Sequence, residues 1–157
     1  MNKQIEIEIE IAMEITYKVN ASVSVEQFIA LMRSSSLGDR RPIENYDCIK
    51  GMINNSNLVI TAWDDEELVG IARSVTDLHY ACYLSDLAVD KKYQNKGIGK
   101  NLLVYTQKQL QQKCKLILIA APAADSYYQH LGFTNNSRCW TLEQGKVLDK
   151  NSYAHKI

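Results

Sequence analysis

The sequence predicts a single α/β domain with a mixed, mostly antiparallel sheet and flanking helices, and three patterns support that fold class. Residues 58–63 and 68–74 are rich in β-formers and are separated by four acidic residues, which predicts an antiparallel hairpin. The apolar period changes from two over 83–89 to 3.6 over 99–113, which predicts a strand and then an amphipathic helix. The unbroken apolar run 116–121 predicts a strand buried on both faces. Strand, helix and strand form a βαβ unit, so we expect 83–89 and 116–121 to be parallel.

The N-terminal third predicts two strands and two helices. Residues 5–11 alternate isoleucine and glutamate, the pattern of a half-buried strand, although this segment could instead be a leader feature. A second short strand is expected over 14–19. Ser22 or Ser24 can cap a helix that carries Glu26 in its first turn and ends near 36–38.

The helix that follows and the C-terminal part complete the predicted order. Residues 43–52 predict a helix after the basic loop Arg40-Arg41-Pro42. A last helix over 123–131 should end at Gly132, a residue suited to the left-handed conformation. Phe133 and 139–142 predict closing strands.

Size and composition limit the function. The 157 residues (17.9 kDa) fit one domain over 1–157, and 46% hydrophobic with 23% charged residues indicates a globular chain. The 18 basic residues balance the 18 acidic ones, so we expect no nucleic-acid or membrane partner and an anionic ligand held by local geometry. No membrane helix or leader is evident. The four cysteines include no C-x-x-C pair, which favours reduced thiols in a cytoplasmic protein, and the three histidines lack metal-ligand spacing, so no metal is expected.

The segment Gln94-Asn95-Lys96-Gly97-Ile98-Gly99 lies between a predicted strand and a predicted helix. The start of a helix presents unpaired N–H groups and the positive end of the dipole, and glycines let a phosphate approach the backbone. The segment therefore predicts an anion site, although a lone Gly-x-Gly is also compatible with a plain tight turn. A dinucleotide fingerprint would need a third glycine at position 102, where Leu102 stands. A P-loop would need glycine at 94 and serine or threonine at 101, where Gln94 and Asn101 stand.

These residues resemble the GNAT superfamily of N-acetyltransferases. Its pyrophosphate loop, Arg/Gln-x-x-Gly-x-Gly/Ala, follows a strand that ends in Leu-x-Val, as Leu87-Ala88-Val89 does here. The segment 124–133, Ala-Asp-Ser-Tyr-Tyr-Gln-His-Leu-Gly-Phe, is similar to the family's Ala-x-x-aromatic-Tyr-x-x-x-Gly-Phe pattern. The resemblance covers about residues 58–134 and implies a GNAT-like sheet opened at a splayed parallel strand pair.

The resemblance also implies roles for individual residues. Acetyl-coenzyme A (acetyl-CoA) would be the cosubstrate, its pantetheine arm pairing with the strand end and Val89 N–H polarising the thioester carbonyl. Tyr128 would be the acid that protonates the departing thiolate. The pyrophosphate would lie on the main chain of the loop residues Gln94, Asn95, Lys96, Gly97, Ile98, Gly99 and Lys100, and the strand end would contribute Leu87, Ala88 and Val89.

Two departures from the family pattern stand out, and both concern side chains near the chemistry. Ala121 occupies the position where the family often has asparagine, and no glutamate stands on the strand before the loop. Asp86 could serve as a base, but its alternation relative to Val89 faces it away from the cleft, which favours a base acting through water, or none.

The acceptor side is predicted less specifically. Arg40 or Arg41 could hold an anionic group of the acceptor, or form only a structural ion pair. Tyr83 and Ser85 lie on the same strand and are further acceptor-side candidates. The aromatic candidates are more often core or rim residues; they are Trp63, His79, Tyr80 and Trp140.

The function predicted from the sequence is therefore transfer of an acetyl group from acetyl-CoA to a primary amine of a small molecule or a protein. One alternative is a non-catalytic acyl-CoA-binding or sensor module. Another is a partner-binding protein that uses the alternating 5–11 segment as an edge strand. The acceptor, the acyl chain length and a homodimeric state are left open.

Overall fold

The computed structural model describes residues 14–148, so the alternating 5–11 segment lies outside the described residues. The described chain forms two compact units, with the boundary between Ile119 and Ala120. The first unit holds a five-stranded sheet and three α-helices, and the second holds one short α-helix. The expectation that residues 1–157 make a single domain stays a prediction.

The sheet of the first unit follows the chain order β1-β2-β3-β4-β5. The first four strands pair antiparallel, whereas β4 and β5 pair in parallel, which confirms the mixed sheet and the βαβ unit. The predicted hairpin is confirmed, with the tight turn at 65–66 and Asp65 in a left-handed conformation. The strands are β1 (Ile15–Val19), β2 (Leu58–Asp64), β3 (Glu67–Thr76), β4 (Ala81–Val89) and β5 (Lys115–Leu118).

Two helices precede the hairpin, and side-chain caps fix where each begins. Helix α1 (Val25–Ser34) starts after Ser24. The Ser24 hydroxyl accepts a hydrogen bond from the Gln27 N–H, and the Ser24 N–H donates to Gln27 Oε1. Helix α2 (Tyr46–Asn54) begins three residues later than predicted, because the Asn45 side chain caps the Cys48 N–H.

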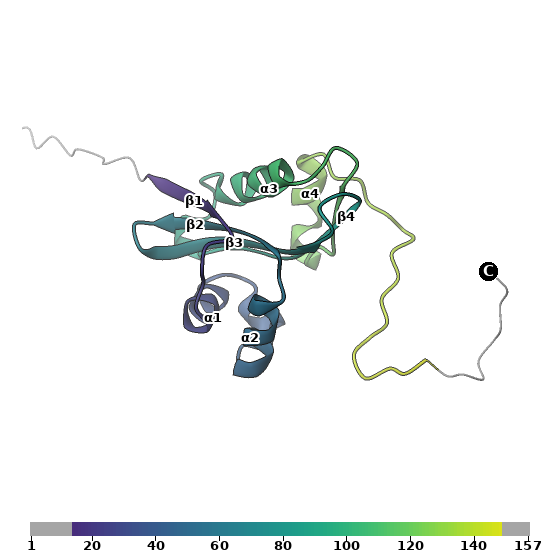
Figure 1. Ribbon diagram of the computed structural model, residues 1–157, viewed down its shortest axis with the longest axis horizontal. Coiled ribbons are helices and arrows are strands. Elements are labelled where there is room, and N and C mark those ends of the chain that lie inside the picture. Colours follow the sequence, from purple (N-terminus) through teal and green to yellow (C-terminus); the bar gives the residue numbers. More distant parts are fainter. Residues whose placement is uncertain (1–13, 149–157) are drawn as a thin grey trace, which may run out of the picture. The chain divides into compact units, whose positions relative to one another are not determined.

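The three α-helices of the first unit cover both faces of its sheet (Figure 1). Helices α1 and α2 lie on one face, where Phe28 and Ile49 pack into a core with Trp63 and Ile71. Helix α3 (Ile98–Gln109) lies on the other face and buries Leu102 and Leu103. It ends before the predicted residue 113 because the chain turns after Gln109.

Gly70 on β3 explains how closely α3 approaches the sheet. A Cβ at this glycine would stand 3.1 Å from Leu102 Cδ1 and 3.2 Å from Ile98 Cγ2. A methyl group here would press on side-chain atoms of the first turns of α3, so glycine allows the close approach of the helix. The start of α3 is thereby fixed relative to β3.

Strand β5 corrects one prediction. The run 116–121 was expected to be buried on both faces, yet Ile117 is 44% exposed and Ile119 is 55% exposed. The reason is its position, because among the strands within 14–148 β5 stands at the end of the sheet and pairs only with β4. An apolar run does not distinguish an edge strand from a central one.

The second unit begins with a 3₁₀ turn over Pro122–Ala124 and continues as α4 (Asp125–His130). Gly132 follows the helix with φ of 89°, which confirms the predicted left-handed ending. The closing strands predicted at Phe133 and 139–142 are wrong, since 133–148 contain turns and no strand. Trp140 is 91% exposed there, so the segment does not bury an apolar face as a strand of a packed sheet would. None of the helices within 14–148 has the length and apolar character needed to span a membrane.

Candidate cofactor-binding and active site

The site begins at the open edge of β4. The Asp90 N–H donates to the Val69 carbonyl of β3 across 2.9 Å. Because successive residues of a strand direct their backbone groups to opposite edges, the N–H groups of Val89 and Leu87 point away from β3. Strand β5 pairs only as far as Leu84, so within residues 14–148 no strand lies beside this edge from Ser85 onward. The open edge can therefore pair with an extended ligand.

The turn after β4 brings the start of α3 to the end of that edge. Asn95 and Gly97 adopt left-handed φ values of 61° and 78°, which turns the chain from β4 into the helix. The first helical bond runs from the Asn101 N–H to the Gly97 carbonyl at 3.0 Å. The earlier N–H groups of the turn have no acceptor inside the helix and carry the positive end of its dipole. This arrangement suits the phosphates of a ligand.

Two side chains fix this turn to the sheet. The Gln94 amide donates to the Val89 carbonyl at 3.1 Å, and the Tyr93 hydroxyl donates to Asp64 Oδ2 at 2.6 Å. The Asp64 carboxylate accepts a hydrogen bond from the Tyr93 hydroxyl and thereby raises the pKa of Tyr93 to about 12. Lys96 lies over the Tyr93 ring, 5.6 Å from its centroid. The turn thus contacts the end of β2 as well as the end of β4.

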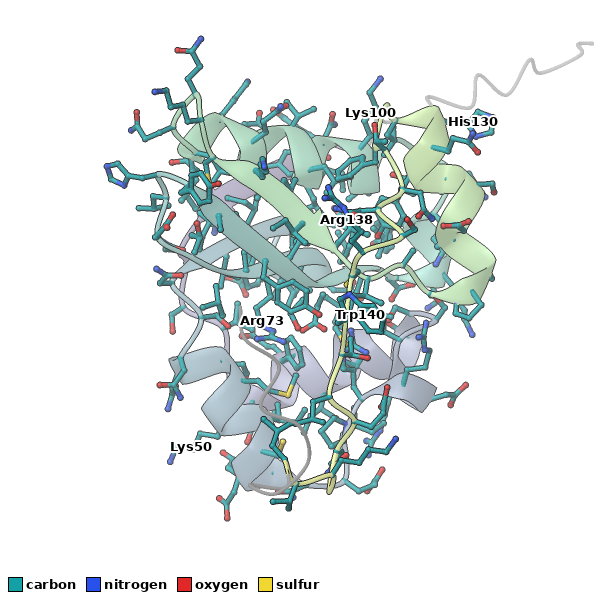
Figure 2. The ribbon with its side chains drawn as sticks, turned by 90° about the vertical axis from the view of Figure 1, so that its right-hand side faces the viewer. Lys50, Arg73, Lys100, His130, Arg138 and Trp140 are labelled. Carbon is teal, nitrogen blue, oxygen red and sulfur yellow. The ribbon has the colours of Figure 1, made fainter. Side chains whose placement is uncertain are left out.

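A β-bulge interrupts β4 at Ser85. Arg73 pairs with Asp86, but Ser74 pairs with Leu84, so Ser85 is an extra residue on β4. The Asp86 carboxylate is fully buried and accepts one hydrogen bond from Arg73 and one from Arg41. Arg73 lies between the sheet and helices α1 and α2 (Figure 2). Sequence reasoning did not single out Arg73, and an arginine within a β-rich run was the available signal.

The comparisons with known proteins decide the family. The family described as acetyltransferase (GNAT) domain matches residues 40–140. The chain belongs to the GNAT acetyltransferase family. The GNAT resemblance predicted from the loop and the 124–133 segment is confirmed, and so is the mixed α/β fold.

The chain is also similar to a curated N-acetyltransferase in sequence and to solved structures in fold. An uncharacterized N-acetyltransferase ycf52-like of Prochlorococcus marinus is 33% identical over an alignment of 110 residues, and the match covers 66% of this chain and 56% of that relative. The chain thus spans a little over half of that protein. A crystal structure of a probable acetyltransferase from meticillin-resistant Staphylococcus aureus has a TM-score of 0.67 at 20% identity, covering 85% of this chain and 100% of that one.

One further structure has a ligand in its name. The structure of AAC(6')-Iy is a complex with the bisubstrate analogue CoA-S-monomethyl-acetylneamine. It aligns with a TM-score of 0.64 at 16% identity and covers 83% of this chain and 98% of that one. At this identity the likeness concerns the fold.

The acceptor-side candidates of this GNAT domain have different surroundings. Each of the three guanidinium nitrogens of Arg41 donates to an atom of the chain, whereas Arg40 is exposed. Tyr83 is 42% exposed and stands two residues before the bulge. Trp63 lies in the core and His79 and Tyr80 are exposed. A role in holding the acceptor stays a prediction for Arg40, Arg41, Tyr83 and Ser85.

Tyr128 lies on α4 in the second unit. Its ring meets Phe133 and Tyr127 edge-on, with centroid distances of 5.5 Å and 5.4 Å. The Phe133 N–H donates to the Tyr128 carbonyl at 3.0 Å, which explains the fixed spacing of the two residues in the motif. Burial raises the pKa of Tyr128, so its hydroxyl keeps its proton at neutral pH. Its contribution to the reaction stays a prediction.

Proposed function

We propose that this chain is an N-acetyltransferase that binds acetyl-CoA along the open edge of β4 and transfers the acetyl group to a primary amine. The observation that carries the proposal is the open β4 edge leading into the left-handed turn at Gly97 and the start of α3. A ligand that combines an extended amide arm with a pyrophosphate suits these two features. The coenzyme A analogue in the structure of AAC(6')-Iy supports the same cosubstrate class.

In the proposed complex the main-chain N–H groups of Gln94 through Lys100 receive the pyrophosphate, and the Leu87–Val89 edge pairs with the pantetheine arm. The Val89 N–H donates to the thioester carbonyl oxygen and stabilises the negative charge that develops there. The amine nitrogen attacks the carbonyl carbon, and the carbon–sulfur bond breaks. The thiolate takes the proton of the Tyr128 hydroxyl, the amine loses its proton to solvent, and the Tyr128 phenolate then regains a proton from solvent.

Asp86 is not the base in this scheme. Its carboxylate is buried and accepts hydrogen bonds from two guanidinium groups. Both carboxylate oxygens are thus occupied by guanidinium N–H groups, and the side chain is fully buried, so neither oxygen is free to meet an acceptor amine. Proton loss through water is the simpler route.

The test has two stages, both with the complete chain. Calorimetric titration with acetyl-CoA and with coenzyme A should give saturable binding. Release of coenzyme A should then be followed over polyamines, aminoglycosides, amino acids and peptides with free N-termini, and we expect turnover with at least one amine. Absence of acetyl-CoA binding would refute the proposal, whereas binding without turnover on any amine would favour the non-catalytic module.

A further inference from the structure

The bulge on β4 is held by side chains rather than by the sheet. Ser85 is the extra residue between the pairs Arg73–Asp86 and Ser74–Leu84, so it has no partner residue on β3. The Ser85 carbonyl accepts from Arg41 Nη2 at 2.8 Å, and the Ser85 hydroxyl accepts from Arg73 Nη2 at 2.9 Å. Two arginines therefore occupy both oxygen atoms of the bulged residue.

The two arginines share one buried carboxylate. Asp86 Oδ1 accepts from Arg41 Nε, and Asp86 Oδ2 accepts from Arg73 Nε. Each arginine therefore binds Asp86 through Nε and Ser85 through Nη2. A planar guanidinium makes such a two-point contact at a fixed angle. The bend of β4 at Ser85 is consequently set by Arg41 and Arg73 together.

The outer ends of the two arginines reach different segments. Arg73 Nη1 donates to Ser56 Oγ at 2.8 Å and to the Met52 carbonyl at 3.3 Å, which ties it to the end of α2. Arg41 Nη1 donates to the Arg40 carbonyl at 2.9 Å, so Arg41 ties the bulge to the loop after η1 (Gly38–Arg40). The side chain of Arg73 is 7% exposed and that of Arg41 is 22% exposed.

This difference separates the two arginines in function. Removing Arg73 would leave Asp86 and Ser85 without their most buried partner and endanger the fold. Removing Arg41 would leave the Arg73–Asp86 pair and release the Ser85 carbonyl, one carboxylate oxygen of Asp86 and the Arg40 carbonyl. The open edge from Leu87 to Val89 begins two residues after Ser85, so its direction depends on this bulge.

We propose that Arg41 is a positioning residue for acetyl transfer: by holding the Ser85 carbonyl and Asp86 Oδ1, it sets the path of the β4 edge that receives the pantetheine arm. The inference rests on the proposed function, and it gives Arg41 a role different from holding an anionic acceptor. Arg41 touches neither the cosubstrate nor the acceptor in this assignment.

The test compares Arg41→Gln with Arg41→Lys and with the control Arg33→Gln. Arg33 on α1 pairs with Glu44 in an exposed ion pair, so the control makes the same arginine-to-glutamine change at a contact that does not involve β4. Hydrogen exchange of the peptide covering 81–90 should speed up in Arg41→Gln and stay unchanged in the control. Acetyl-CoA should bind at least about threefold more weakly and kcat should fall at least about tenfold, because small displacements of a reacting group are costly. The acceptor KM should not change.

Arg41→Lys separates geometry from charge. A lysine keeps the positive charge but lacks the planar fork, so we expect it to behave like the glutamine variant. Full recovery by lysine would refute the positioning role, because charge alone would then suffice. Should Arg41→Gln fail to fold, the lysine variant takes its place in the exchange measurement and the cosubstrate titration.

The remaining outcomes are also decisive. Wild-type exchange and wild-type acetyl-CoA affinity in both Arg41 variants would overturn the inference. So would an effect confined to the KM of acidic acceptors, since that result assigns Arg41 to the acceptor. A wild-type chain that binds no acetyl-CoA would refute the proposed function instead, and the exchange of 81–90 would still test the hold on the bulge.

Discussion

The Gln94 side-chain amide donates a hydrogen bond to the Val89 carbonyl across 3.1 Å and so joins the turn to the end of the β4 edge. The carbonyl points away from β3, on the same edge as the Val89 N–H. The preceding residue, Tyr93, adds the bond to Asp64 at the end of β2. The chain's own side chains therefore hold the turn on two strands, and such preorganisation reduces the ordering cost of binding.

Replacing Tyr93 with phenylalanine removes only the hydroxyl that donates to Asp64. We expect a loss of about 0.5–1.5 kcal/mol in the free energy of unfolding at neutral pH, the usual net contribution of one hydrogen bond. The folded pKa of Tyr93, about 12, lies above the reference value of 10.0. The stability from this bond is therefore complete below about pH 10 and is lost as pH rises through about 12.

Urea unfolding of the wild type and Tyr93→Phe at a series of pH values checks this dependence. The difference between the two proteins should shrink in the alkaline range and remain constant between about pH 6 and 9. Tyr46→Phe is a suitable control, because Tyr46 is 50% exposed on α2. A difference that grows with pH would contradict the role of the phenol as donor.

Gly97 should be required for acetyl-CoA binding rather than for folding. Its φ of 78° is unfavourable for a β-branched residue, although the space around its Cβ position is open. Gly97→Val should weaken acetyl-CoA binding at least about tenfold, or roughly 1.4 kcal/mol, by moving the N–H groups of the turn. Calorimetric titration measures the change.

Gly145→Val is the matched control for that substitution. Gly145 has a nearly equal φ of 80° and equally open surroundings, but it lies in the second unit, outside the turn. Its variant should bind acetyl-CoA with wild-type affinity. Equal affinities for the wild type and a folded Gly97→Val would remove this turn from the proposed site.

The sequence predicted best those features of the site that depend on residues close together in the chain. The switch of apolar period places the turn between β4 and α3, and the left-handed residues Asn95 and Gly97 are where the motif puts them. The parallel pairing of β4 and β5 followed from the helical crossover that connects them. Each of these inferences depends on residues close together in the chain.

The sequence did not predict features that depend on distant residues. Arg41 and Asp86 are 45 residues apart, and nothing in either segment indicates that they meet. The start of α2 was misplaced because 43–45 have apolar and polar residues compatible with a helix, while the Asn45 cap decides the boundary. The closing strands were wrong because β-propensity reflects burial against a partner, which 133–148 lack in the structure.

Gly70→Ala should destabilise the fold through α3. The added Cβ would come within 3.3 Å of Leu102, Ile98 and Ala62 atoms, closer than ordinary contacts. Overpacking of this kind costs about 1–3 kcal/mol. The displaced start of α3 should also weaken acetyl-CoA binding. Urea unfolding and titration of the same variant measure the two effects.

Gly51→Ala provides the opposite expectation with the same chemical change. Gly51 lies inside α2 and no atom stands within 4 Å of its Cβ position. Alanine should therefore stabilise the protein by about 0.5–1 kcal/mol through helix propensity. If Gly70→Ala were as stable as Gly51→Ala, the close approach of α3 to β3 would be disproved.

Tyr128→Phe separates the proposed role of the Tyr128 hydroxyl as an acid from the packing role of its ring. The substitution keeps the edge-on contacts with Phe133 and Tyr127 and deletes only the hydroxyl. Burial raises the pKa of this phenol above its ordinary value of 10.0, so the proton is present throughout the neutral range. A phenol hydrogen-bonded to the departing thiolate can supply that proton in the transition state. We expect kcat to fall by a factor of about 10² to 10⁴ with acetyl-CoA affinity nearly intact, because the group acts only in the transition state.

Tyr127→Phe is the matched control on the adjacent residue of α4, and its kcat should stay at the wild-type value. A folded Tyr128→Phe whose chemical step, measured in a single turnover, runs at the wild-type rate would leave protonation of the thiolate to solvent.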